Sequence, residues 1–278
     1  MTLQITGRRP DGYHTLCSLV TFCDVGERIT LTPAQNDSLE VVGPFAHLVG
    51  PADDNLAMKA ARLLRQSAER DAMTHGFHIR IDKQIPVAAG LGGGSADAAA
   101  VLRATNNLWK LNRSVDRLQE LGSALGADVP MCVTAQPAWI GGIGEVVEET
   151  ALPAGLHLVL VNPGVSVPTG AVFGRLNLAD NEINAAQKSD VATPEALLST
   201  MRAVGNDLQI PASAEAPEIA EVLARLDKLP EVTFTGMSGS GATCFALFGD
   251  GPSAERSRHL LAADHPEWWI KSAPISPS

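Results

Sequence analysis

Hydrophobic and polar residues alternate with a period of two in residues 28–32 and 77–82 of the first half of the chain. This alternation is typical of β-strands with one buried face. Between the two strands, Asn55 closes a helix-capping run, and apolar side chains then follow at helical spacing over residues 56–64. Two further helices are predicted, at residues 95–108 and from Ser114 onward.

The pattern restarts near residue 150, after a loop at residues 151–155 that carries Pro and Gly. The sequence of the second half predicts a helix that begins at Thr193 and two further helices, at 216–226 and 253–263. It also predicts strands at 156–161, 232–234, 243–248 and 268–271. We therefore expect an α+β fold in two domains, residues 1–150 and 151–278.

Composition narrows the class of protein. The 278 residues are 45% hydrophobic and 19% charged, which suits a packed core and excludes a disordered or collagen-like chain. A net charge of −10 without a basic run makes nucleic acid and anionic membrane surfaces poor partners. The four cysteines show no metal-binding spacing, and neither a secretory signal nor an apolar run of ~20 residues is found. We expect a cytoplasmic protein without a metal site of its own.

The strongest chemical signal is a glycine-rich segment that follows a predicted strand and opens a helix. Its backbone N–H groups and the positive end of the helix dipole can hold phosphate. It lacks the lysine of a Walker A loop and the third glycine of a dinucleotide fingerprint. A flexible linker is the alternative, but linkers rarely join a buried strand to an alanine-rich helix. The segment comprises Pro86, Val87, Ala88, Ala89, Gly90, Leu91, Gly92, Gly93, Gly94, Ser95 and Ala96. Ser95 either caps the helix or turns its hydroxyl to a phosphate oxygen or Mg²⁺.

Asp128 lies between small and apolar residues, where a carboxylate is costly to bury without a partner or a task. It could accept a hydroxyl proton during phosphoryl transfer. The alternative is an aspartate that forms a turn and is satisfied by the local backbone.

Two more segments are candidates for ligand contact. Residues 235–243 form a second small-residue loop between strands, although a plain hairpin turn is the alternative. In the segment 7–14, Tyr13 could offer a flat face to a nucleobase, with His14 beside it. Ordinary packing at a strand start is the simpler interpretation of these two residues.

Together these segments resemble the GHMP kinases. Residues 86–96 are similar to the second motif of that superfamily, and residues 235–243 are similar to its third. The segments 7–14, 125–130 and 163–169 more narrowly resemble the GHMP kinases that act on a cytidyl diphosphate sugar alcohol. The resemblance implies a ribosomal protein S5 domain 2-like N-terminal domain and a ferredoxin-like C-terminal domain, with the active site in the cleft between them.

The resemblance also implies roles for individual residues. The enzyme would transfer the γ-phosphoryl group of ATP, with Mg²⁺ inferred from ATP chemistry, to the 2-hydroxyl of a methylerythritol unit in non-mevalonate isoprenoid synthesis. Asp128 would be the catalytic aspartate and would contact the acceptor. The remaining implied contacts are residues 86–96 to the triphosphate, Asn55 and Leu56 to adenine, and Tyr13, His14, Thr169 and Phe173 to the cytidyl substrate.

One departure from the family leaves alternatives open. The family carries a lysine on a strand before the Thr-Gly that corresponds to Thr6-Gly7, and no residue of this sequence takes that position. We therefore expect low activity for this chain, because a positive charge beside Asp128 would be missing. The alternatives are a catalytically weak nucleotide-binding protein and a GHMP kinase for another small alcohol. The pair Tyr13 and Phe173 favours a substrate that carries a base.

Overall fold

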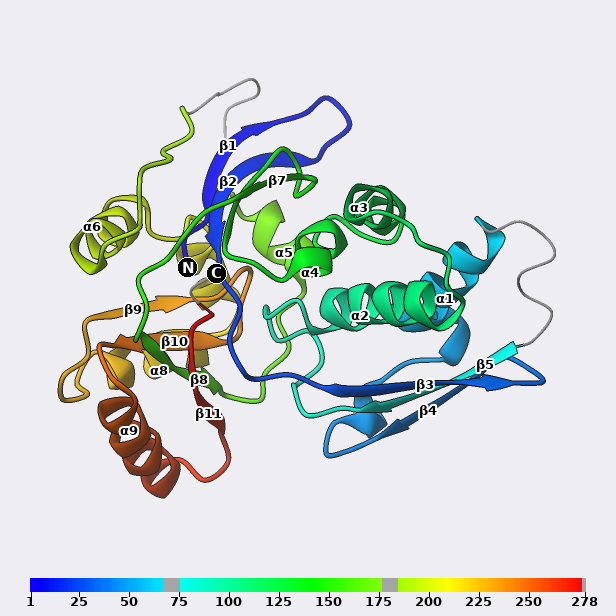
Figure 1. The fold of residues 1–278 in the computed structure, drawn as a ribbon. Helices are drawn as coiled ribbons and strands as arrows, with labels where there is room; N and C mark the ends of the chain where they lie inside the picture. Colours follow the sequence, from blue (N-terminus) through cyan, green and yellow to red (C-terminus); the bar gives the residue numbers. More distant parts are fainter. Residues whose placement is uncertain (68–75, 177–184, 277–278) are drawn as a thin grey trace. The chain divides into compact units, whose positions relative to one another are not determined.

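A computed structural model describes residues 1–67, 76–176 and 185–276 (Figure 1). The chain forms two compact units. Unit 1 comprises Met1–Val25, Ala88–Leu91 and Gln136–Ser278, and unit 2 comprises Gly26–Val87 and Gly92–Ala135. Each unit contains helices and a largely antiparallel arrangement of strands, which confirms the predicted α+β class.

The compact units divide the chain differently from the predicted domains, 1–150 and 151–278. Four strands of the first 150 residues belong to unit 1: β1 (Gln4–Arg8), β2 (His14–Val20), β6 (Ala138–Gly141) and β7 (Val146–Glu149). The two compact units reflect which residues contact one another in space, whereas the predicted domain limits follow a break in the sequence pattern near residue 150. The domain limits therefore stay a prediction.

Unit 1 holds two antiparallel sheets. The first has the order β1-β2-β6-β7. The second has the order β11-β8-β10-β9, with bounds Trp269–Pro274, His157–Asn162, Cys244–Phe248 and Phe234–Met237. The strand predicted at 232–234 is wrong for most of its length, because Phe234, Thr235, Gly236 and Met237 are the residues that pair with β10.

The central strands β8 and β10 are buried on both faces, which explains their unbroken apolar sequences. On one face, Val159 and Phe248 pack with residues of α8 (Glu218–Leu226) and α9 (Gly251–Asp264). On the other, Leu160 and Leu247 pack with residues of α6 (Pro194–Val204). Two short helices complete this unit within the described residues, α5 (Thr169–Gly174) and α7 (Gln209–Glu215).

Unit 2 is a three-stranded sheet covered by helices on one side (Figure 1). The sheet has the order β3-β5-β4, with bounds Arg28–Ala34, Gly76–Asp82 and Ser38–Val42, and β4 runs parallel to β5. The helices are α1 (Leu56–Gln66), α2 (Gly93–Leu108), α3 (Val115–Ser123) and α4 (Val129–Thr134). Helices α1 and α2 pack together, and buried alanines on both allow a close approach.

No helix in the described part of the chain has the length and apolar character needed to cross a membrane.

Candidate functional site

The glycine-rich segment leads from β5 into α2. Gly92 is the N-cap residue of α2, with a left-handed backbone (φ 67°, ψ 20°), and the helix begins at Gly93. The helix therefore starts two residues before the predicted Ser95. The proposed capping role of Ser95 is wrong, because a residue in the first turn cannot be the cap. Its hydroxyl, which is half-buried, stays a candidate for ligand contact.

The first turn of α2 has free donors. Among the described residues, the N–H groups of Gly93, Gly94 and Ser95 donate no hydrogen bond, whereas Ala96 N–H donates to Gly92 O at 2.9 Å. Unpaired N–H groups at a helix N-terminus, together with the dipole, attract anions. A side chain at Gly92 would occupy open space, since nothing lies within 4 Å of a Cβ built there. This turn can therefore hold a phosphate group.

Within unit 1, the start of the glycine-rich segment contacts the second small-residue loop, residues 235–243. Ser238 Oγ donates to Gly90 O at 2.9 Å, and Thr243 N–H donates to Ala89 O at 3.2 Å. A Cβ at Gly90 would lie 2.5 Å from Gly241 O and 2.6 Å from Ser238 O, so this position requires glycine. The start of the glycine-rich segment and the 235–243 loop, which were predicted as separate sites, are thus joined by hydrogen bonds.

The 235–243 loop also contacts two other parts of unit 1. Thr169 Oγ1 and Ser240 Oγ share a hydrogen bond of 2.9 Å, which places Thr169, at the start of α5, beside the loop. Asn206 Nδ2 donates to Met237 O at 2.9 Å and to Gly239 O at 2.8 Å. Sequence reasoning missed Asn206. Its only local signal is a turn-forming Gly-Asn-Asp run, and the two carbonyls that accept from its Nδ2 lie more than thirty positions away in the sequence.

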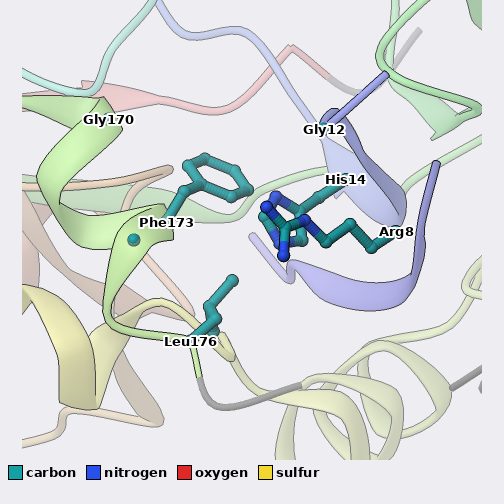
Figure 2. A pocket seen from close by; sticks show the side chains of 7 residues that line it. Arg8, Gly12, His14, Gly170, Phe173 and Leu176 are labelled. Carbon is teal, nitrogen blue, oxygen red and sulfur yellow. The ribbon is translucent and has the colours of Figure 1, made fainter. Parts of the chain in front are cut away.

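A pocket of about 330 Å³ lies in unit 1 near the turn between β1 and β2 (Figure 2). Figure 2 shows the side chains of Arg8 and His14 facing Phe173, which comes from α5. The rings of His14 and Phe173 have centroids 5.2 Å apart and are tilted by 34°. Desolvation, followed by the charge of Arg8, lowers the pKa of His14, which favours a neutral imidazole. The full lining is Arg8, Gly12, His14, Gly170, Phe173, Gly174 and Leu176.

The predicted aromatic pair is only partly assembled. Phe173 and His14 line the pocket, but Tyr13 does not, and this residue is 62% exposed. The ring beside Phe173 in the described chain is that of His14, at a tilt of 34°, and the role of Tyr13 stays a prediction. The neutral imidazole and the phenyl ring together offer a flat, partly apolar wall.

Asp128 lies at the start of α4 in unit 2, where its side chain makes no capping hydrogen bond. The residue is exposed to solvent, contrary to the expectation of a buried carboxylate. The surrounding protein nevertheless removes part of the hydration of the carboxyl group and raises its pKa. An accessible carboxylate with a raised pKa, and with no hydrogen-bond or ion-pair partner in the described part of the chain, is suited to accept a proton.

Asn55 and Leu56 lie at the start of α1, next to the start of α2. Asn55 Oδ1 accepts from Ala57 N–H at 2.9 Å, and so caps α1 as predicted. A Cβ at Gly94 would lie 3.8 Å from Leu56 Cδ1. These two residues are therefore beside the turn that can hold phosphate. The Asn55 amide NH₂ donates no hydrogen bond within the described ranges and is available for a ligand.

Three charged side chains are buried beneath that turn, and sequence reasoning missed the group. Lys83 Nζ lies 2.5 Å from Glu27 Oε1 and 3.4 Å from Asp97 Oδ2. Their side chains are 8%, 2% and 9% exposed, in the order Lys83, Glu27, Asp97. Burial, followed by the hydrogen bond with Glu27, raises the pKa of Asp97 to about 8. The local signal was weak, since the three residues belong to separate segments and only the fold brings them together.

No group of three or more His, Cys, Asp or Glu side chains in the described ranges could hold a metal ion.

Comparison with known proteins places the chain in a family. The family model "GHMP kinases N terminal domain" matches residues 55–136, and "GHMP kinases C terminal" matches residues 183–263. A relative from Cereibacter sphaeroides, named 4-diphosphocytidyl-2-C-methyl-D-erythritol kinase, is 44% identical over 276 residues, which cover 98% of this chain and 95% of the relative.

Solved structures agree with that assignment. A crystal structure of 4-(cytidine 5'-diphospho)-2C-methyl-D-erythritol kinase matches with a TM-score of 0.77 and 31% identity, over 100% of this chain and 96% of that one. Homoserine kinase from Cytophaga hutchinsonii matches with a TM-score of 0.64 over 100% and 94%, but at 15% identity it shows the fold alone. The chain belongs to the GHMP kinases and, among them, to the 4-diphosphocytidyl-2-C-methyl-D-erythritol kinase family.

Proposed function

We propose that this chain transfers the γ-phosphoryl group of ATP to the 2-hydroxyl of 4-diphosphocytidyl-2-C-methyl-D-erythritol, a step of non-mevalonate isoprenoid synthesis. The observation that carries the proposal is the 44% identity to a kinase of that name over nearly the whole chain. The resemblance of the segments quoted above points to the same substrate. The two alternatives are not favoured, since the matching relatives are named as kinases of this substrate and the homoserine kinase shares only the fold.

The phosphate of ATP would bind the first turn of α2. The free N–H groups of Gly93, Gly94 and Ser95 support this role, because they supply donors that need no positive side chain. Asn55 and Leu56 would contact adenine beside the same turn. ATP brings Mg²⁺ as its usual counter-ion; the Ser95 hydroxyl is the side chain of this turn that could contact the ion or a phosphate oxygen.

The cytidyl group would bind the pocket of Figure 2. Phe173 would stack on the base, His14 would recognise its edge, and Thr169 would contact the substrate from the start of α5. A neutral His14 carries one N–H donor and one acceptor nitrogen, which suits the edge of a cytosine. Tyr13, which is exposed, would cover the other face of the base once the substrate is bound.

Asp128 would accept the proton of the acceptor hydroxyl or orient that hydroxyl for attack. Its accessibility and its lack of a capping bond support the role, since the carboxylate is free to contact a substrate. The loose transition state of phosphoryl transfer requires mainly positioning and charge stabilisation. We also expect a cytoplasmic location, in keeping with four free cysteines and small-molecule substrates.

A coupled assay of ADP release tests the proposal. The chain is incubated with Mg-ATP and, in turn, the cytidyl substrate, mevalonate and homoserine. We expect turnover with the cytidyl substrate alone. Turnover with either small alcohol, and none with the cytidyl substrate, would contradict the proposal.

A further inference from the structure

The buried cluster of Glu27, Lys83 and Asp97 touches the turn that can hold phosphate. Asp97 is the fifth residue of α2, and the helix starts at Gly93. A Cβ at Gly93 would lie 3.5 Å from Lys83 Nζ and 3.8 Å from Glu27 Oε2. The ammonium group and a carboxylate thus lie directly against the backbone whose N–H groups are free. Any net charge of the cluster acts on a phosphate bound there.

The cluster combines three segments of unit 2. Glu27 precedes β3, Lys83 follows β5, and Asp97 belongs to α2. Lys83 Nζ is the only cation within 4 Å of the two carboxylates among the described residues. Glu27 Oε1 is at ion-pair distance but lacks a well-aligned hydrogen bond in the described chain, so its charge is compensated mainly by Lys83.

The net charge of the cluster depends on one proton. Lys83 and an ionised Glu27 cancel, so the cluster is neutral while Asp97 is protonated and carries −1 when Asp97 ionises. The pKa of Asp97, raised to about 8 by burial and by Glu27, places this change close to physiological pH. On α4, the group near Asp97 is the Cys132 thiol, whose pKa of about 12 keeps it neutral over the same range.

We propose that Glu27, Lys83 and Asp97 form a charge-balanced support for the first turn of α2, and that its neutrality sets the affinity of that turn for the polyphosphate of ATP. The three are positioning residues. They act on the bound phosphate through the backbone of α2 and through the electrostatic field of the cluster. Loss of the Asp97 proton adds a negative charge beneath the bound phosphate and weakens binding. The inference rests on the proposed function only in naming ATP as the ligand.

Equilibrium titration with a non-hydrolysable ATP analogue and Mg²⁺ tests the proposal without turnover. The dissociation constant is measured from about pH 7 to 9.5, above the phosphate pKa of about 6, so the ligand charge stays constant. We expect the dissociation constant of the parent chain to rise on the order of tenfold as pH passes 8, the scale of one charge near a helix end.

Two variants separate charge from structure. Asp97→Asn keeps Lys83 and Glu27 in balance at every pH. Glu27→Gln leaves Lys83 paired with an ionised Asp97, which is again neutral. Both are expected to abolish the rise with pH and to bind the analogue at pH 9.5 more tightly than the parent chain. Asp116→Asn, an exposed carboxylate in the first turn of α3, is the matched control and should retain the rise.

The pH dependence of the dissociation constant, in the parent chain and in the variants, decides whether the proposal holds. A parent dissociation constant that stays flat with pH, or a rise that persists in Asp97→Asn, overturns the proposal. If Asp97→Asn fails to fold, Glu27→Gln carries the same test. Uniformly weaker binding by both variants, with the rise intact, would show a packing role only. Failure of the proposed function is seen separately, as analogue binding without phosphorylation of the cytidyl substrate.

Discussion

Ser238 Oγ donates a hydrogen bond of 2.9 Å to the backbone carbonyl of Gly90, and so joins two loops that lie 148 positions apart in the sequence. Thr243 N–H and Ala89 O make a second bond between the same loops. Gly90 has a positive φ of 72°, and only the absence of its side chain allows the loops to approach. The conformation of residues 88–91 is therefore fixed from outside the glycine-rich segment.

Gly90→Ala is expected to disrupt this junction. A Cβ there would lie 2.5 Å from Gly241 O, and a non-glycine residue at positive φ alone costs about 1–2 kcal/mol. We expect a lower midpoint of thermal unfolding and a raised KM for ATP, measured by calorimetry and by the coupled assay. Gly155→Ala is the control, because Gly155 also has positive φ (83°) but nothing lies within 4 Å of its Cβ position. Equal effects of the two substitutions would show that the contact with Gly241 is unimportant.

Asp128→Asn is expected to lower kcat by about 10²–10⁴-fold with little change in either KM, because an amide cannot accept the proton. Asp116→Asn, an exposed control in the same unit, should leave kcat unchanged. A kcat within about threefold of the parent value for Asp128→Asn would remove Asp128 from the reaction.

The activity should also depend on pH through Asp128. The carboxyl must be ionised to accept a proton, and desolvation raises its pKa. The acid-side fall in kcat/KM is therefore expected at a higher pH than for an ordinary aspartate, whose pKa is about 3.9. A pH–rate profile measured under conditions where the fold is intact checks this. An acid limb at or below the ordinary value would contradict the assignment.

Phe173→Ala is expected to raise the KM for the cytidyl substrate, since loss of one base–aromatic stack costs about 1–3 kcal/mol, or roughly 5- to 150-fold. The KM for ATP should not change. Tyr13→Ala provides a comparison, because Tyr13 is exposed and does not line the pocket in the free chain. An effect of Tyr13→Ala on the cytidyl KM alone would show that Tyr13 joins the site on binding. Equal effects of either variant on both substrates would contradict the stacking role.

Asp97 should make the stability of the fold depend on pH. Its pKa of about 8 in the folded state lies above the ordinary aspartate value of 3.8, so the folded state binds the proton more tightly. The stabilisation is complete below about pH 4 and is lost as pH rises to about 8. Urea unfolding of the parent chain and Asp97→Asn is compared across this range. The free energy of unfolding of the parent chain, measured relative to that of Asp97→Asn, should fall as pH rises. A difference between the two chains that stays constant with pH would contradict the raised pKa of Asp97.

Much of the fold was determined by local sequence. The alternation at residues 77–82 and the apolar face after Asn55 predict β5 and α1 because strand and helix periodicities depend on neighbours in the chain. The glycine-rich segment also defined its own chemistry, since free N–H groups at a helix start need no distant partner. Even there the first residue of α2 was misplaced, because a glycine N-cap gives no side-chain signal.

The tertiary structure decided which distant residues meet. The bond from Ser238 to Gly90, the ring contact of His14 with Phe173, and the burial of Lys83 between Glu27 and Asp97 each join separate segments. Contacts of this kind leave no periodic trace in the chain. A buried charge is tolerated only where its partner is supplied by the fold, and a one-dimensional pattern does not record that partner.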